Sequence, residues 1–196
     1  VRYAAKRGVK SLGVTLSKEQ AEWGQAKIKE EGLEDLAEIR FMDYRDVTEE
    51  GFDAISAIGL LEHIGVKNYP AFFSFLNGKL KPGGLMLNHC ITYPDNHKTP
   101  KGGFIDRYIF PDGELSGSGT ITKCMQDAGF EVVHTESLRF DYMRTLHAWC
   151  ENLKETWEEA CSLVGLPTAR LWAIYMAGSE WGFEHNIINL YHFLGV

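Results

Sequence analysis

Residues 52–65 read FDAISAIGLLEHIG, and this stretch decides the fold class. Residues 52–58 have the length and the β-branched and aromatic content of a buried strand, which ends at Gly59. Glu62 and His63 follow at the start of a helix candidate, where an acidic side chain is favoured by the helix dipole. A strand that passes directly into a helix in this way favours an α/β fold.

The segments on both sides repeat this alternation, which predicts a parallel sheet with helices on both faces. Ser17 has the position of an N-cap, and Gln20 completes a capping-box pattern. Beyond a short polar helix candidate at 1–8, further strands are predicted at 11–16, 37–41, 84–91, 130–138 and 186–194, and helices at 18–31, 68–79, 120–128, 141–164 and from Pro167 to about Trp181.

The carboxyl ends of the first four strands are the expected ligand site, because ligands of such sheets bind there. Three of these four ends carry polar side chains. The ends are Thr15-Leu16, Asp43-Tyr44-Arg45, Ile58-Gly59 and His89-Cys90.

Composition limits the class of protein. A net charge of −7 disfavours binding to nucleic acid, and no apolar stretch approaches the ~20 residues of a membrane span. No secretory signal is visible, so a cytoplasmic protein is expected. The four cysteines show no metal-ligand spacing and are interpreted as reduced core thiols; they are Cys90, Cys124, Cys150 and Cys161.

The segment at about 93–119 interrupts the alternation and is rich in proline and glycine. A loop of this length is usually functional or disordered, and its aromatic content favours order. Its basic residues are Lys98, Lys101 and Arg107. Contact with lipid headgroups or an acidic carrier and plain solvation both stay open for these three side chains.

Five segments together carry a resemblance to a known family. They are GVTLSKEQ (13–20), DYRD (43–46), IGLLEHIG (58–65), FIDRYIFPDGEL (104–115) and SLRFDYMRTL (137–146), the last followed by Trp149. In this order and spacing the chain resembles the cyclopropane-fatty-acid and mycolic acid cyclopropane synthases. The resemblance implies a Rossmann-like seven-stranded methyltransferase sheet in one domain over 1–196, largely parallel with one antiparallel strand near the end.

The resemblance also implies a reaction and its partners. The family uses S-adenosylmethionine to methylate the cis double bond of an unsaturated phospholipid acyl chain. The carbocation that results loses a proton, with a bound bicarbonate ion as the acceptor, and closes to a cyclopropane. We therefore expect a lid at about 93–119, a helical lipid-channel segment at about 141–182 and transient contact with the inner membrane surface. A homodimer stays an open alternative.

Site residues are carried over from the family's motifs. Glu62, His89, Tyr142 and the Ile58 backbone match the bicarbonate site. The cofactor-binding positions are Thr15, Leu16, Gln20, Asp43, Tyr44, Arg45, Ile58 and Gly59. Each has a purely structural alternative: Glu62 as a helix opener, His89 as a hydrogen-bonded core residue, Tyr142 as packing and Tyr44-Arg45 as a solvated turn. Core packing is the default for Trp149, Trp157, Trp172, Tyr175 and Trp181.

The chain departs from the family at its beginning. It starts at the helix that should follow the family's first strand and glycine-rich cofactor loop, and a helical segment with an active-site cysteine is also absent. We expect upstream residues in the natural protein, and we expect the strands at 11–16 and 52–58 to lack their shared neighbour. A smaller departure is His192, which stands where many relatives have glutamine.

Three other functions stay open. The product could be a methyl branch or a methylene group, since both arise from the same carbocation. The substrate could be an amine or hydroxyl of a small molecule, which would need no bicarbonate site. The chain could also be a non-catalytic binding module. An intact upstream glycine-rich loop would favour the enzyme, and its true absence would favour the binding module.

Overall fold

A computed structural model describes residues 1–97 and 102–196, so the predicted basic positions Lys98 and Lys101 lie outside the described residues. The described chain forms two compact units, Val1–Glu49 and Glu50–Val196. Each unit is described by itself.

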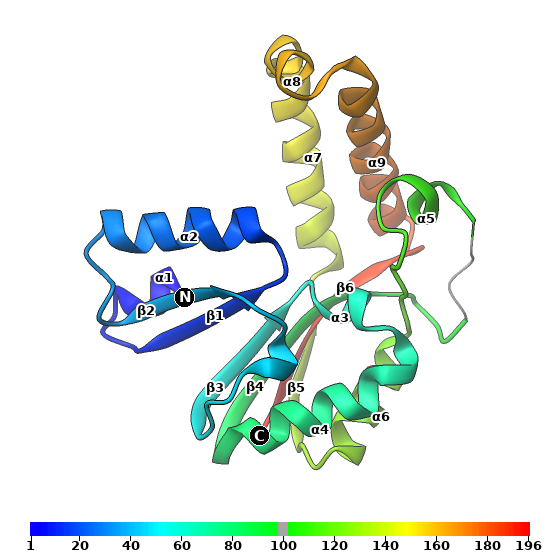
Figure 1. The fold of residues 1–196 in the computed structure, drawn as a ribbon. Coiled ribbons are helices and arrows are strands. Elements are labelled where there is room, and N and C mark those ends of the chain that lie inside the picture. The colour runs from blue at the N-terminus through cyan, green and yellow to red at the C-terminus, as the bar shows by residue number, and fades with distance from the viewer. Residues whose placement is uncertain (98–101) are drawn as a thin grey trace. The chain divides into compact units, whose positions relative to one another are not determined.

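The first unit is a parallel strand pair covered by a helix (Figure 1). The helix α2 packs on both strands, and the apolar core consists of Ala5, Ile28 and Ala37. The strand predictions at 11–16 and 37–41 are confirmed to within one residue. The elements are α1 (Arg2–Ala5), β1 (Ser11–Thr15), α2 (Lys18–Glu30), β2 (Ala37–Phe41) and the 3-10 helix η1 (Tyr44–Asp46).

Only half of the predicted capping box forms at the start of α2. Ser17 Oγ accepts a hydrogen bond from the Gln20 amide at 3.2 Å, as an N-cap should. The Gln20 side chain does not return to the Ser17 amide, because Thr15 Oγ1 already accepts from that amide at 3.1 Å. Thr15 and Gln20 are instead bonded to each other, which ties the end of β1 to the first turn of α2.

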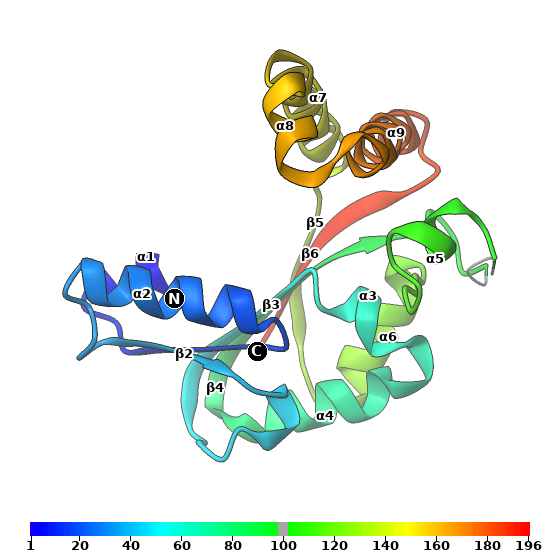
Figure 2. The ribbon, with the colours of Figure 1, turned by 45° about the horizontal axis from the view of Figure 1, so that its top comes forward.

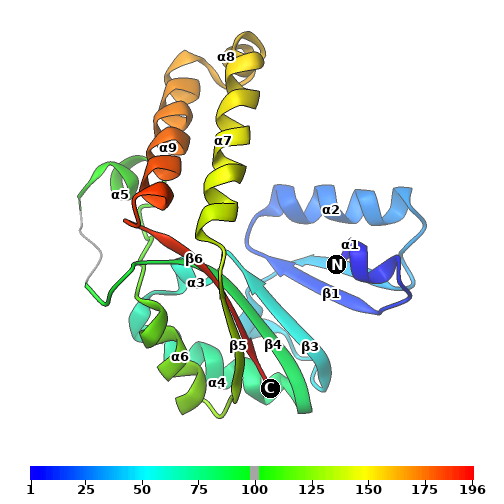
Figure 3. The same ribbon diagram turned by 180° about the vertical axis from the view of Figure 1, so that it is seen from behind.

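The second unit contains a four-stranded sheet in the order β3-β4-β6-β5 (Figures 1 and 3). β3 and β4 are parallel, and β6 runs antiparallel to both of its neighbours, which confirms the single antiparallel strand expected near the end. The strands are β3 (Phe52–Ile58), β4 (Leu80–Thr92), β5 (Val132–Ser137) and β6 (Asn189–Gly195). The helices are α3 (Leu61–Ile64), η2 (Val66–Asn68), α4 (Tyr69–Lys79), α5 (Phe104–Tyr108), α6 (Ser118–Asp127), α7 (Arg139–Glu155), α8 (Trp157–Val164) and α9 (Leu166–Glu184).

The two faces of this sheet differ. Alternate residues of β4, from Met86 to Cys90, are fully buried on the face covered by α4 and α6 (Figure 2). Met86 pairs with Gly195, whose Cα lies against Met125 of α6, which fixes this assignment. The residues between them, including His89, therefore point to the opposite face, since side chains alternate along a strand.

Helices α7 and α9 lie side by side and pack through Leu146 and Phe183 onto Leu190 of β6 (Figures 1 and 3). The single helix predicted over 141–164 is wrong, because the chain breaks between α7 and α8 at Thr156. The Thr156 hydroxyl donates to the carbonyl of Asn152 at 2.8 Å, and its backbone leaves the helical region there. A bond of this kind destabilises a helix only slightly, and Thr145 makes the same bond to Asp141 inside α7 without a break.

Other boundaries also differ from the prediction. β4 begins at Leu80 rather than residue 84, because Leu80 pairs with Phe52 before the register shifts across the glycine turn. The predicted strand at 130–138 begins at Val132 and ends at Ser137. The last strand begins at Asn189 rather than residue 186, because α9 continues to Glu184 before its closing turn.

β1 and β3 are the strands for which the sequence predicts an unpaired edge. Among the described residues β1 pairs only with β2, and β3 pairs only with β4.

No helix of the described residues has the length and apolar composition needed to cross a bilayer.

Candidate functional site

The candidate site of the second unit begins where β3 ends. The Gly59 amide donates to the His89 carbonyl at 2.9 Å, and Ile58 pairs with His89 in the parallel register. Gly59 has a φ of +61°, which a residue without a Cβ adopts at low cost, and this turn directs the chain into α3. Ile58 is 65% exposed, and its backbone is the part that lies next to His89.

Glu62 of α3 is the central acidic group of this unit. Its Oε1 accepts a hydrogen bond from the Ile91 amide of β4 at 2.8 Å. Its Oε2 is buried and has no hydrogen-bond partner among the described residues. Burial raises the pKa of the Glu62 carboxyl group, and the bond from Ile91 opposes this only in part.

The segment before α6 holds Glu62 in place. The Glu114 amide donates to the Glu62 carbonyl at 2.9 Å, and a Glu114 carboxylate oxygen accepts from the Val66 amide at 2.7 Å. The short helix α3 and the start of η2 are thus both tied to the motif at 104–115. The sequence interpretation treated that motif only as a resemblance and missed the role of Glu114 as a clamp.

Two tyrosines of the helical pair lie within electrostatic range of Glu62. Burial raises the pKa of Tyr142 and of Tyr175, and the negative charge of Glu62 raises both further. The Tyr142 ring also packs edge-on against Phe183, with centroids 5.1 Å apart. Tyr142 was a predicted site residue, whereas for Tyr175 core packing was the default interpretation.

His89 lies next to Ile58 on the sheet face opposite α4 and α6. Its Nδ1 atom is buried without a hydrogen-bond partner among the described residues. Its ring contacts His192 of β6, with centroids 5.0 Å apart. Burial, and then the charge of His192, lower the pKa of His89, so the neutral imidazole is favoured.

The cysteine at the same strand end is chemically quiet. Cys90 is fully buried, and Asn88 Nδ2 donates to its sulfur at 3.2 Å. Burial raises the pKa of its thiol far above the usual range, so the nucleophilic thiolate is disfavoured. The interpretation of Cys90 as a core thiol is confirmed, whereas Cys124, Cys150 and Cys161 are only partly buried and are free.

The predicted cofactor residues of the first unit form two small groups. Thr15 Oγ1 donates to Gln20 Oε1 at 2.9 Å, and the neighbouring Leu16 side chain is 70% exposed. Both side chains of the Thr15–Gln20 pair are near the surface at the carboxyl end of β1. A ligand that accepts a hydrogen bond from the Thr15 hydroxyl must therefore replace this bond, whereas the Gln20 amide nitrogen takes no part in it.

The second group is the turn at Asp43, Tyr44 and Arg45. Asp43 Oδ1 accepts from the Arg45 amide at 2.9 Å, and the guanidinium donates to both carboxylate oxygens. These bonds from Arg45 lower the pKa of Asp43 to about 2. The Arg45 guanidinium is thus directed at Asp43, while Tyr44 is half-buried beside it. That this turn binds the cofactor stays a prediction.

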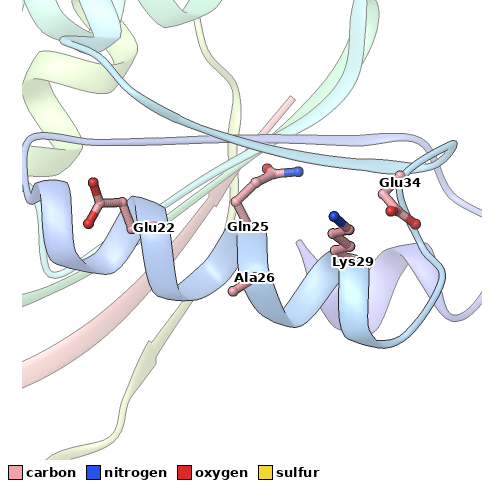
Figure 4. A pocket seen from close by; sticks show the side chains of 5 residues that line it. All are labelled: Glu22, Gln25, Ala26, Lys29 and Glu34. Carbon is pink, nitrogen blue, oxygen red and sulfur yellow. The ribbon is translucent and has the colours of Figure 1, made fainter.

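Two surface hollows are lined by other residues. One, on α2, is lined by Glu22, Gln25, Ala26, Lys29 and Glu34 (Figure 4). Another lies between α7 and α9 and is lined by Met143, Arg144, His147, Glu180 and Glu184. Neither contains a predicted site residue. The described residues contain no group of three or more histidine, cysteine, aspartate or glutamate side chains placed to hold a metal ion.

Comparison with known proteins identifies the family. The family described as mycolic acid cyclopropane synthetase matches residues 1–193. The chain belongs to this family. Its fold is that of the class I methyltransferases, as the solved structure of the cyclopropane synthase CmaA1 with SAH and CTAB shows: the TM-score is 0.89 at 27% identity, covering 99% of this chain and 72% of that one.

Two curated members of the family match this chain over part of their own length. A probable fatty acid methyltransferase of Mycobacterium tuberculosis is 60% identical over 99% of this chain and 46% of its own length. The cyclopropane-fatty-acyl-phospholipid synthase of Escherichia coli is 32% identical over 96% of this chain and 47% of its own length. The chain thus spans about half the length of these two relatives.

Proposed function

We propose that the protein is an S-adenosylmethionine-dependent C-methyltransferase that forms a cyclopropane on the cis double bond of unsaturated phospholipid acyl chains. In this reaction the sulfur–methyl bond breaks and a carbon–carbon bond forms to the alkene. One proton then leaves the transferred methyl group, and ring closure consumes the carbocation. The products are S-adenosylhomocysteine, the cyclopropane chain and one proton.

The observation that carries this proposal is the environment of Glu62. A buried carboxyl group is costly unless its oxygens are bonded, yet Oε2 has no partner among the described residues. A raised pKa is the usual mark of a carboxyl group that handles protons or polar ligands at neutral pH. Family membership indicates which chemistry to test for such a group.

The surrounding groups fit a small oxyanion such as bicarbonate. Bicarbonate would supply a base next to the carbocation. Glu62 Oε2 can accept a hydrogen bond from a ligand hydroxyl, and Tyr142, kept protonated by its raised pKa, can donate one. His89 has a free buried nitrogen for a further bond. Ile58 remains a proposed backbone partner through its pairing with His89.

Aromatic rings near Glu62 suit a cationic intermediate. Tyr175 packs edge-on against Phe110 and Trp172, with centroids 5.9 and 5.4 Å away, and Phe110 also packs against His63. Aromatic faces stabilise a cation without adding to it, and they exclude the water that would convert it to an alcohol. Tyr175 and Phe110 thus have a proposed role beyond packing.

The cofactor role of the first unit is part of the same proposal. Thr15, Leu16, Gln20 and the turn at 43–45 are proposed to contact S-adenosylmethionine, because they follow the carboxyl ends of the parallel pair β1 and β2, where ligands of such sheets bind. In the second unit the Ile58-Gly59 backbone is a proposed cofactor contact for the same reason, since it lies at the carboxyl end of β3.

A second product within the same chemistry is favoured by one observation. The relative with 60% identity is named a probable fatty acid methyltransferase, which leaves a methyl branch or methylene group as the alternative to a ring. An N- or O-methyltransferase would use a heteroatom lone pair, and its reaction would give the buried Glu62 oxygen no ligand to bind.

The deciding experiment is mass spectrometry of lipids from cells that express the full-length gene and receive methyl-deuterated methionine. A cyclopropane or methylene product adds one CH2 with two deuterium atoms to an unsaturated chain. A saturated methyl branch, which also requires a hydride donor and a proton, adds two further hydrogens. Resistance to catalytic hydrogenation then separates the ring from the methylene group. Unlabelled lipids from cells whose protein binds S-adenosylhomocysteine would refute the lipid assignment.

Transient membrane contact is proposed because a phospholipid chain must leave its bilayer to react. Flotation of the full-length protein with unsaturated phosphatidylglycerol vesicles would test this contact at the inner membrane surface. Sedimentation of the same protein would show whether it is a monomer or a homodimer.

A further inference from the structure

The sheet face that carries His89 holds a row of ionisable side chains. The register pairs Ile58 with His89, His89 with His192, and His192 with Glu136. Residues paired across neighbouring strands share one face, so the two histidines and the glutamate lie side by side across β4, β6 and β5. Only His89 of these three was a predicted site residue.

The row is asymmetric in charge. The two imidazole rings meet edge to face with centroids 5.0 Å apart, a distance at which two positive charges repel. His192 Nδ1 lies 3.9 Å from Glu136 Oε2, while the Nδ1 atom of His89 has no partner among the described residues. Among the described residues the Glu136 carboxylate thus lies beside His192 and not beside His89.

We propose that His192, held beside Glu136, is a positioning residue that keeps His89 in its neutral form. A neutral imidazole has one N–H donor and one acceptor nitrogen, whereas an imidazolium has two donors and no acceptor. Only the neutral ring can donate to one ligand atom and accept from another. This catalytic consequence rests on the proposed function, but the charge assignment does not.

The other groups near His192 leave this assignment intact. His134 of β5 contacts the same Glu136 carboxylate, with Nε2 3.8 Å from Oε2, but it pairs with Leu194 and is one step further from His89. On the α7 side β6 meets Leu146 and Tyr142 around Leu190. On the α6 side the neighbours are apolar, as at Gly195.

The test is a histidine NMR titration of full-length protein, between about pH 5 and 8 where imidazoles titrate. His192→Gln keeps a polar side chain but removes the titrating ring. We expect the midpoint of His89 to rise by about half a pH unit or more, since the neighbouring positive charge is lost. His134→Gln is the matched control, and there we expect the His89 midpoint of the wild type.

Glu136→Gln provides a second route if His192→Gln does not fold. Without the carboxylate the pair has no reason to place its proton on His192, so the midpoints of the two histidines should move closer together. An unchanged His89 midpoint in folded His192→Gln, an unchanged separation of the two midpoints in folded Glu136→Gln, or an equal rise in His134→Gln would overturn the proposal.

A kinetic readout connects the pair to catalysis. The acidic limb of the kcat/KM profile should move to higher pH in His192→Gln, with the KM for S-adenosylmethionine unchanged. A protein that shows the NMR coupling but methylates no lipid would refute the proposed function and leave the role of His192 intact.

Discussion

The candidate residues of the two units differ in whether their polar atoms have hydrogen-bond partners within the protein. In the first unit Thr15 bonds to Gln20 and Asp43 bonds to Arg45, all close to solvent. In the second unit Glu62 and His89 each keep a buried polar atom without a partner among the described residues. An unmatched buried atom is costly in the folded state and favours a ligand, whereas a satisfied exposed pair must first open. Substitutions in the second unit should therefore mainly lower the rate of the chemical step. Substitutions in the first unit should mainly weaken cofactor binding.

The largest effect is expected for Glu62→Gln. The amide oxygen can still accept from Ile91, but the carboxylate is lost, so kcat/KM should fall at least ~100-fold. Because burial raises the pKa of Glu62, its favourable contribution is present at acid pH and is lost as pH rises through the folded-state value. The variant should therefore gain stability relative to the wild type as pH rises to neutrality.

Denaturant unfolding at several pH values, together with the lipid assay, checks both parts. Glu158→Gln on the exposed surface of α8 is the control, with no change expected in either. If Glu62→Gln lowered stability and left kcat intact, Glu62 would be structural and the contrast between the units would disappear.

Tyr142→Phe should lower activity less than Glu62→Gln does. The ring keeps its contact with Phe183, so unfolding should be nearly unchanged, while loss of one donor to the ligand should lower kcat about 10-fold. Tyr191→Phe is a suitable control, because Tyr191 pairs with Cys90 and so lies on the opposite face of the sheet. Equal effects from the two substitutions would remove Tyr142 from the proposed site.

Much of the fold could be predicted because strand and helix signals are local. The strand at 52–58 is bounded by glycines on both sides, and Ser17 marks the start of α2, so both were placed correctly. The break at Thr156 was not predicted, because no glycine or proline lies between residues 139 and 164 to mark it. The early start of β4 depends on pairing with Phe52, which is not local.

The site was less predictable, because its contacts are not local in the sequence. Motifs identified Glu62, His89 and Tyr142 as candidates, but the bond from Ile91 and the clamp by Glu114 join residues distant in sequence. His192 was noticed only as a departure from relatives. Its meaning depends on strand register, which places it between His89 and Glu136.

A moderate effect is expected for Thr15→Val in the first unit. Valine suits a strand but cannot bond to Gln20 or to the Ser17 amide. We expect the Kd for S-adenosylhomocysteine to rise several-fold, up to about 10-fold, with kcat nearly unchanged at saturating cofactor. Calorimetry on full-length protein measures this, with Thr48→Val as the exposed control. A fall in kcat without a change in Kd would contradict the division of roles between the units.

The smallest effect is expected for Asp43→Asn, and it should depend on pH. Arg45 lowers the pKa of Asp43 to about 2, so the pair stabilises the fold above the ordinary aspartate value of about 4 and loses this contribution as pH falls toward 2. The wild type should therefore be slightly more stable than the variant at neutral pH, and the difference should vanish in strong acid. Both side chains are near solvent, so salt should reduce the difference as well. A difference that persisted at the lowest pH would contradict this account, because asparagine and a protonated aspartate differ little as caps on η1.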